Sequence, residues 1–142
     1  MTTTDGPGRP DVELRVPADG AFASVLRTTT AGLAARLDFT IDDIEDLRIA
    51  VGEAHALALE QAPADVVGDL LCGFTLQPGR ITVTVSVAVD GAVEPDLQSF
   101  AWQVLSTLAS EADWVSGDGR FTVTMTMTSS ALPPVADAPA AL

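Results

Sequence analysis

The fold of this chain is decided by one stretch, Ile41-Asp42-Asp43-Ile44-Glu45-Asp46-Leu47-Arg48-Ile49-Ala50-Val51-Gly52-Glu53-Ala54-His55-Ala56-Leu57. Thr40 followed by Asp43 has the spacing of a helix N-cap with an acidic third residue. Pro63 ends the pattern just after Gln61. We therefore predict one long helix whose apolar positions face a core together, namely Ile44, Leu47, Val51, Ala54 and Ala58.

Working outward from this helix, the remaining periodic segments predict the order β-α-α-β-β-α-β-β. They are a strand at 12–16, a helix at about 21–37, a hairpin of 70–76 with 81–89, a helix at about 97–112, and a hairpin of 114–115 with 121–128. Hairpin-linked strands with helices between them predict an α+β two-layer sandwich. We expect a mixed, mostly antiparallel sheet with the helices on one face. The Thr/Ser face is left for solvent or another subunit.

The chain has 142 residues, enough for one domain. Residues 1–10 are polar and rich in Gly and Pro, so we expect a disordered arm. The folded domain is predicted over 11–128. Residues 129–142 are expected to form a disordered Pro/Ala tail.

The composition excludes several classes of function. The net charge of −13 argues against nucleic acid as a direct partner, because phosphates attract Arg and Lys, and all seven basic residues are Arg. No apolar run approaches 18 residues and the N-terminus lacks an apolar core, so we expect a cytoplasmic protein without membrane contact. The single Cys72 excludes an internal disulfide and a multi-cysteine zinc site, and we interpret it as a core residue.

The element order, together with Asp46-Leu47-Arg48-Ile49-Ala50-Val51-Gly52-Glu53-Ala54, resembles the RsbW-like anti-sigma factors. These are small members of the GHKL (histidine-kinase-type, Bergerat-type) ATPase fold, and the resemblance covers about 12–128. It implies binding of an RNA polymerase sigma factor, phosphorylation of a serine on a STAS-type anti-anti-sigma partner, and a homodimer. The segment Ser99-Phe100-Ala101-Trp102-Gln103-Val104-Leu105 looks closest to the actinobacterial UsfX-type branch.

The resemblance also assigns two helix positions one turn apart. The family's general base falls on Glu53. Its magnesium-binding Asn falls on Leu57, which has no oxygen to coordinate a hard cation. Glu53 has an alternative interpretation as a partly buried helix carboxylate held by Arg48 or by a backbone group.

Two further nucleotide elements of the family are altered in this chain. The adenine-reading Asp-x-Gly falls on or near Val87-Ala88-Val89, with Asp90 three residues after Val87. The Gly-rich lid falls on Gln98-Ser99-Phe100-Ala101, where Phe100 and Leu97 are expected to fill the space that phosphates need. We therefore expect a degenerate ATP pocket and no cofactor or metal, with ATP and magnesium as the alternative.

The resemblance also implies that this chain retains the arginine through which the family contacts its protein partners. Arg27 lies thirteen residues before Thr40, and an Arg at this spacing contacts both partners from the exposed side of the first helix in the family. Ser24 lies one turn earlier. Taken alone, Arg27 could be an ordinary solvated residue, and His55 is interpreted as structural.

Three hypotheses follow from these assignments. The first is an anti-sigma factor that sequesters its sigma factor by direct contact and is counteracted by an anti-anti-sigma partner. The second is an active serine/threonine kinase using Glu53 as base. The third is a scaffold or dimerisation domain that binds another regulator.

Overall fold

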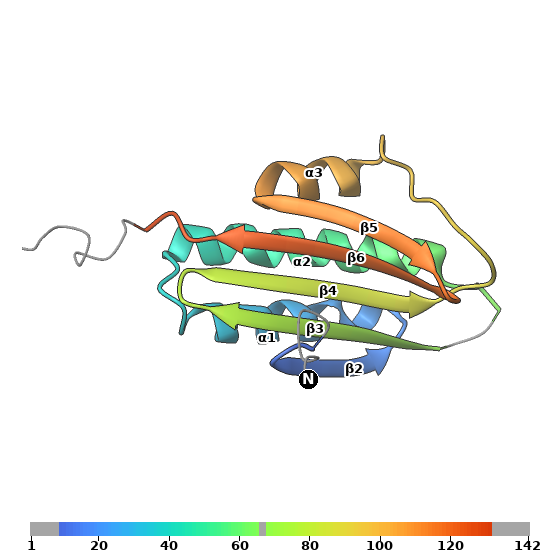
Figure 1. Cartoon of the computed structure of the whole chain (residues 1–142), viewed down its shortest axis with the longest axis horizontal. Helices are drawn as coiled ribbons and strands as arrows, with labels where there is room; N and C mark the ends of the chain where they lie inside the picture. The colour runs from blue at the N-terminus through green and yellow to red at the C-terminus, as the bar shows by residue number, and fades with distance from the viewer. Residues whose placement is uncertain (1–8, 66–67, 132–142) are drawn as a thin grey trace, which may run out of the picture.

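The computed structural model describes residues 9–65 and 68–131, and the arm up to residue 8 and the tail from residue 132 lie outside them. The elements follow the predicted order (Figure 1). They are β2 (Val12–Pro17), the short 3-10 helix η1 (Gly20–Phe22), α1 (Ala23–Ala34), α2 (Ile41–Gln61), β3 (Asp69–Gln77), β4 (Arg80–Ala88), α3 (Phe100–Leu108), β5 (Glu111–Gly117) and β6 (Arg120–Thr128).

The sheet has the strand order β2-β3-β4-β6-β5, and each neighbouring pair is antiparallel. The expected mixed sheet is therefore wrong for the described residues. Tight turns at Gly79 and at Asp118-Gly119, all with positive φ, force two of the pairs to run in opposite directions. The passage through α3 and β5 then returns β6 antiparallel to β4.

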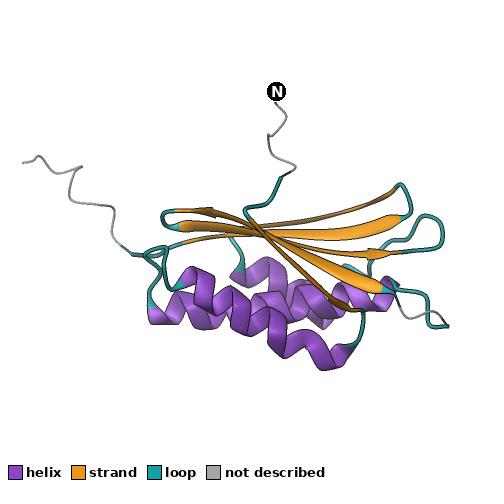
Figure 2. Ribbon diagram, turned by 90° about the horizontal axis from the view of Figure 1, so that it is seen from below, coloured by secondary structure: helices purple, strands orange, loops and turns teal. Residues whose placement is uncertain are grey.

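All three helices cover one face of the sheet (Figure 2), which confirms the two-layer α+β sandwich. Alternate strand residues point into the interface between the layers because side chains alternate across a strand. The core is built from such residues and from the apolar stripe of α2, among them Leu47, Val51, Leu57, Val83, Val85, Val123 and Met125. The opposite sheet face carries hydroxyls, and Thr82 and Thr126 hydrogen-bond across it at 3.0 Å.

The α2 helix begins and ends as predicted. The Thr40 hydroxyl accepts a hydrogen bond from Asp43 N, and the Asp43 carboxylate accepts one from Thr40 N, so the capping box is complete. The helix ends at Gln61, before Pro63.

The other two helices are shorter than predicted. The α1 helix ends at Ala34, and Asp38, with a positive φ of 65, interrupts the helical conformation before α2. The α3 helix begins only at Phe100, because the Ser99 hydroxyl accepts from Trp102 N and makes Ser99 the N-cap. Strand β5 begins at Glu111, so it includes residues 111 and 112, which lie within the predicted helix.

The folded domain continues past Thr128 into the segment predicted as a tail. Ser129 N donates to Gly79 O at 2.8 Å, and the Ser129 hydroxyl donates to Asp38 O at 2.8 Å. Ser130 donates to the Asp43 carboxylate from its backbone N at 2.9 Å and from its hydroxyl at 3.0 Å. We call this connection the Asp43 clasp, and it ties the end of β6 to the first turn of α2.

Among the described residues, no helix is both long and apolar enough to cross a membrane.

Candidate functional site

Glu53 and Leu57 lie on α2, as predicted, but in different environments. Glu53 is half-buried, whereas Leu57 is 0% exposed and belongs to the hydrophobic core. Leu57 is buried because it continues the helical stripe of Leu47, Val51 and Ala54 toward the sheet. A buried hydrocarbon at this position does not fit magnesium, which prefers carboxylate, carbonyl and water oxygens.

The described residues do not supply a cluster of metal-ligating side chains elsewhere. No group of three or more His, Cys, Asp or Glu lies close enough to hold an ion within residues 9–65 and 68–131. Glu53 is partly buried, as its structural interpretation expects, but Arg48 does not pair with it, because the sole ion pair in the same residues joins Arg15 to Asp69 at 2.8 Å.

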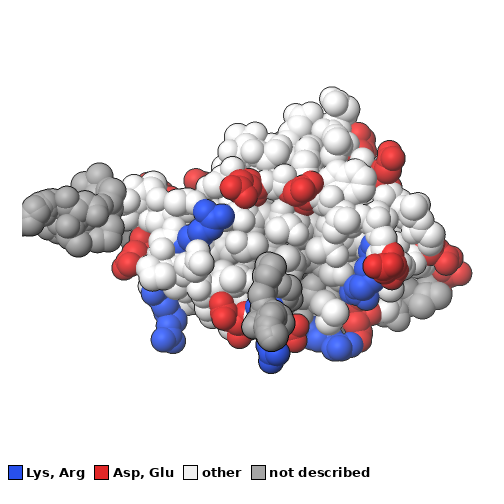
Figure 3. All heavy atoms as spheres, viewed as in Figure 1, with Lys and Arg blue, Asp and Glu red and all other residues white. Residues whose placement is uncertain are grey.

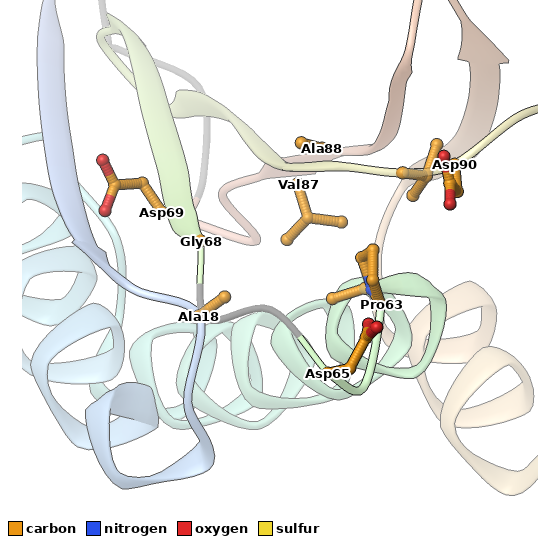
Figure 4. Close-up of a pocket in the computed structure, with 10 residues that line it drawn as sticks. Ala18, Pro63, Asp65, Gly68, Asp69, Val87, Ala88 and Asp90 are labelled. Carbon is orange, nitrogen blue, oxygen red and sulfur yellow. The ribbon is translucent and has the colours of Figure 1, made fainter.

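Val87 and Asp90 line a cavity of about 240 Å³ at the end of β4 (Figure 4). Ala62 and Pro63, just after α2, line its other side. Glu53, Leu57 and Phe100 are not among the lining residues, so this cavity does not join the predicted adenine position to the predicted catalytic position. Its walls are mostly small and apolar, and Asp65, Asp69 and Asp90 are also among the lining residues.

The predicted lid does not close over α2. Phe100 is 77% exposed and Leu97 is 45% exposed, so the expectation that both fill the phosphate space is wrong. The reason is local, since the Ser99 N-cap makes Phe100 the first residue of α3. Ala101, the next residue, faces inward and is buried.

Arg27 lies between α1 and α2 rather than projecting freely from the exposed side of α1. It is half-buried, and its Nη1 lies 3.3 Å from the position that a Cβ on Gly52 would occupy. Within the described ranges it forms no ion pair. Ser24 is exposed in the first turn of the same helix.

His55 lies one turn after Gly52 on α2 and is only 2% exposed. Its Nε2 has no hydrogen-bond partner among the described residues. Burial lowers the pKa of His55, and the nearby Arg27 charge lowers it further, while Asp19 acts in the opposite direction. The structural interpretation of His55 therefore omitted its proximity to Arg27, which only the packing of α1 against α2 reveals.

The single histidine of the chain makes stability depend on pH. Because the folded pKa lies below the ordinary 6.5, the unfolded chain binds the proton first as pH falls. The His55 contribution to the free energy of unfolding should thus be constant above about pH 7.5 and should decrease below 6.5, by about 1.4 kcal/mol for each unit of pKa difference. Urea unfolding between pH 7.5 and 5.5 measures this slope. His55→Gln should abolish it, and a wild-type stability that stays constant over the interval contradicts the prediction.

Cys72 is confirmed as a core residue. It is 1% exposed on β3, and burial raises the pKa of its thiol to about 12. A thiol that remains protonated at neutral pH is a poor nucleophile, so Cys72 does not suit a redox switch.

The described residues on the outer face of the sheet do not gather charge of one sign. On the side shown in Figure 3, acidic and basic side chains lie scattered, although the chain has a net charge of −13. Ser86 accepts hydrogen bonds there from Arg120 Nε at 2.8 Å and Thr122 Oγ1 at 3.1 Å, so these polar groups are engaged within the sheet. Arg27, which forms no ion pair within the described residues, belongs to α1 in the helical layer instead.

Comparison with known proteins identifies relatives of one kind, although no protein-family model matches the chain. The serine-protein kinase RsbW of Bacillus cereus (strain B4264) is 33% identical over 93 residues, which cover 66% of this chain and 56% of that protein. The protein of the same name from Bacillus thuringiensis (strain Al Hakam) is 35% identical over 75 residues, covering 53% and 47%. The chain thus spans about half the length of the curated relatives it matches.

The fold also matches a solved structure, that of the RsbU and RsbW domains of Rv1364c from Mycobacterium tuberculosis. The TM-score is 0.61 over 84% of this chain and 33% of that one, at 23% sequence identity. A similarity at this level of identity concerns the fold alone.

Proposed function

We propose, from the premise that this chain is an RsbW-like protein of the GHKL fold, that it sequesters an RNA polymerase sigma factor by direct contact. The observation that carries the proposal is Arg27, a half-buried cation on the helical layer that forms no ion pair within the described residues. An Arg held in this way suits a carboxylate on the surface of a partner, because its planar fork donates two parallel hydrogen bonds.

Release of the sigma factor by an anti-anti-sigma protein of the STAS type is part of the same proposal. If both partners use Arg27, they compete for one surface and cannot bind together. Size-exclusion chromatography of this protein with its sigma factor, with and without the anti-anti-sigma protein, tests the competition. A stable ternary complex would contradict a shared Arg27 contact. The same column gives the mass of the free protein and tests the proposed homodimer.

Replacing Arg27 tests the contact directly. Arg27→Ala should weaken sigma-factor binding by about 10- to 100-fold, the range for a central interface arginine. Arg36→Ala is the matched control, because Arg36 is also an arginine of this helix region but is exposed beyond the end of α1. Isothermal titration against each purified sigma factor of the host supplies the affinities. Equal affinity of the Arg27 variant and the Arg36 variant for the bound sigma factor would contradict the assignment.

We further propose that this binding needs no ATP. The proposal is supported by Leu57, buried where the family's magnesium ligand is expected, and by the exposed Phe100 in place of a glycine lid. Titration with Mg-ATP should then show no binding in the micromolar range, and phosphate transfer to an anti-anti-sigma protein should be absent.

An active serine/threonine kinase is the second candidate, and the half-buried Glu53 is the observation in its favour. This candidate expects phosphate transfer that Glu53→Ala abolishes while sigma-factor binding persists. The assay that separates the two candidates is incubation of the protein with radiolabelled ATP and the anti-anti-sigma protein. The scaffold hypothesis is separated by co-purification from the native cell, since it expects no sigma factor among the bound proteins.

A further inference from the structure

We propose that Gly52 is a positioning residue, because its missing side chain leaves the room in which the Arg27 guanidinium lies across α2. In this position the guanidinium can bind a partner's carboxylate. This inference rests on the proposed function for its binding consequence, but the placement of Arg27 can be tested without any partner. Gly52 is not part of the nucleotide assignment and was not among the predicted site residues.

The side chain of Arg27 lies in the space next to Gly52. A Cβ at this position would lie 3.3 Å from Arg27 Nη1 and 3.6 Å from Arg27 Cδ. The first distance is tighter than ordinary van der Waals contact, which begins at 3.4 Å. An alanine methyl therefore requires the guanidinium to move by a few tenths of an ångström, whereas the distance to Cδ is ordinary van der Waals contact. The arginine occupies the room that the missing side chain leaves.

Backbone conformation does not explain a glycine at this position. Gly52 lies in the interior of α2 and has no positive φ, so an alanine there would favour the helix. Gly32 in α1 is likewise helical, but a Cβ on it would meet no atom within 4 Å. A methyl group at Gly52 would therefore contact Arg27, whereas a methyl group at Gly32 would contact nothing within 4 Å.

Among the described residues, no carboxylate forms an ion pair with Arg27. His55, one turn after Gly52, is buried, and its pKa is lowered both by burial and by Arg27, so it is neutral at pH 7. Asp19, the N-cap of η1, is the one carboxylate with a resolved effect on His55, and it engages Ala21 N at 2.9 Å. A guanidinium confined by packing beside α2 loses less side-chain entropy when a carboxylate binds it than a freely rotating one does.

The experiment compares Gly52→Ala with Gly32→Ala in the full chain. We expect Gly52→Ala to bind the sigma factor about three- to tenfold more weakly, because its arginine must be reordered on binding. Gly32→Ala should bind as the wild type does. Both variants should keep or raise the melting temperature, so loss of fold does not explain the difference. In an Arg27→Ala background, Gly52→Ala should have no further effect on affinity, whereas a merely structural glycine would give additive losses.

A second measurement needs no partner. The NMR titration of the His55 ring reports the distance to the Arg27 charge, since that charge lowers the pKa of His55. Gly52→Ala should raise the pKa toward the value found in Arg27→Gln, while Gly32→Ala leaves it unchanged. A His55 titration that Gly52→Ala does not shift overturns the positioning role. If the shift occurs but the wild type binds no sigma factor, the positioning stands and the proposed function fails.

Discussion

Leu57→Asn is expected to lower the free energy of unfolding by about 3–5 kcal/mol, although it restores the residue type that a magnesium site of this family uses. Leu57 is 0% exposed, and its side chain packs in the core between α2 and the sheet. The substitution removes buried hydrocarbon and places an amide within the hydrophobic cluster, where burial of a polar group is costly. Urea unfolding followed by circular dichroism measures the loss.

The control is Leu57→Met, which conserves volume and should cost less than about 1.5 kcal/mol. A second readout is Mg-ATP titration of the Asn variant, which should show no gain of binding. A stable Asn variant that binds Mg-ATP would mean that the space beside Glu53 is open, and the proposed degenerate pocket would then be wrong.

Asp43→Ala is expected to lower the free energy of unfolding by about 2–4 kcal/mol, because it breaks the Asp43 clasp and half of the capping box. Burial raises the pKa of Asp43, but hydrogen bonds from Ser130 and Thr40 outweigh that effect and lower the pKa overall. The stability that these bonds supply is therefore fully present above the unfolded value of 3.8, and it is lost as pH falls through the folded pKa.

Thermal unfolding of wild type and variant at pH 7 and at pH 3 checks this prediction. The difference between the two proteins should be smaller at pH 3, because below 3.8 the unfolded wild-type chain binds a proton at Asp43 more readily than the folded chain does. Ser130→Ala should reproduce part of the loss at pH 7, and the double variant should lose less than the sum of the two. Additive losses would show that Asp43 acts through Thr40 alone.

The sequence predicts the parts of this molecule that depend on neighbours along the chain. The Thr40–Asp43 capping box, the limits of α2 and the hairpin turn at Gly79 all follow from short motifs, and the structure confirms them. The start of α3 was missed, because Ser99 was assigned to the phosphate lid rather than to an N-cap.

Contacts between distant segments could not be predicted in the same way. Ser130 reaches Asp43 across 87 positions of the chain, and its sequence context is that of a tail rich in Pro and Ala. The contact of Arg27 with Gly52 depends on how α1 packs against α2, which no local pattern specifies. The sequence shows that residue 57 is a leucine and lacks the oxygen of a magnesium ligand. Only its burial in the structure shows that this position belongs to the hydrophobic core.

The Asp43 clasp also sets the order in which this domain can mature during synthesis. A ribosome releases the chain from its N-terminus, at about 5–20 residues per second, so α2 emerges well before Ser130 does. Until then the Asp43 carboxylate has its partner in Thr40 but lacks the three donors from Ser129 and Ser130. A nascent chain stalled shortly after Thr128 should therefore be more sensitive to protease in the first turn of α2 than one stalled far beyond it.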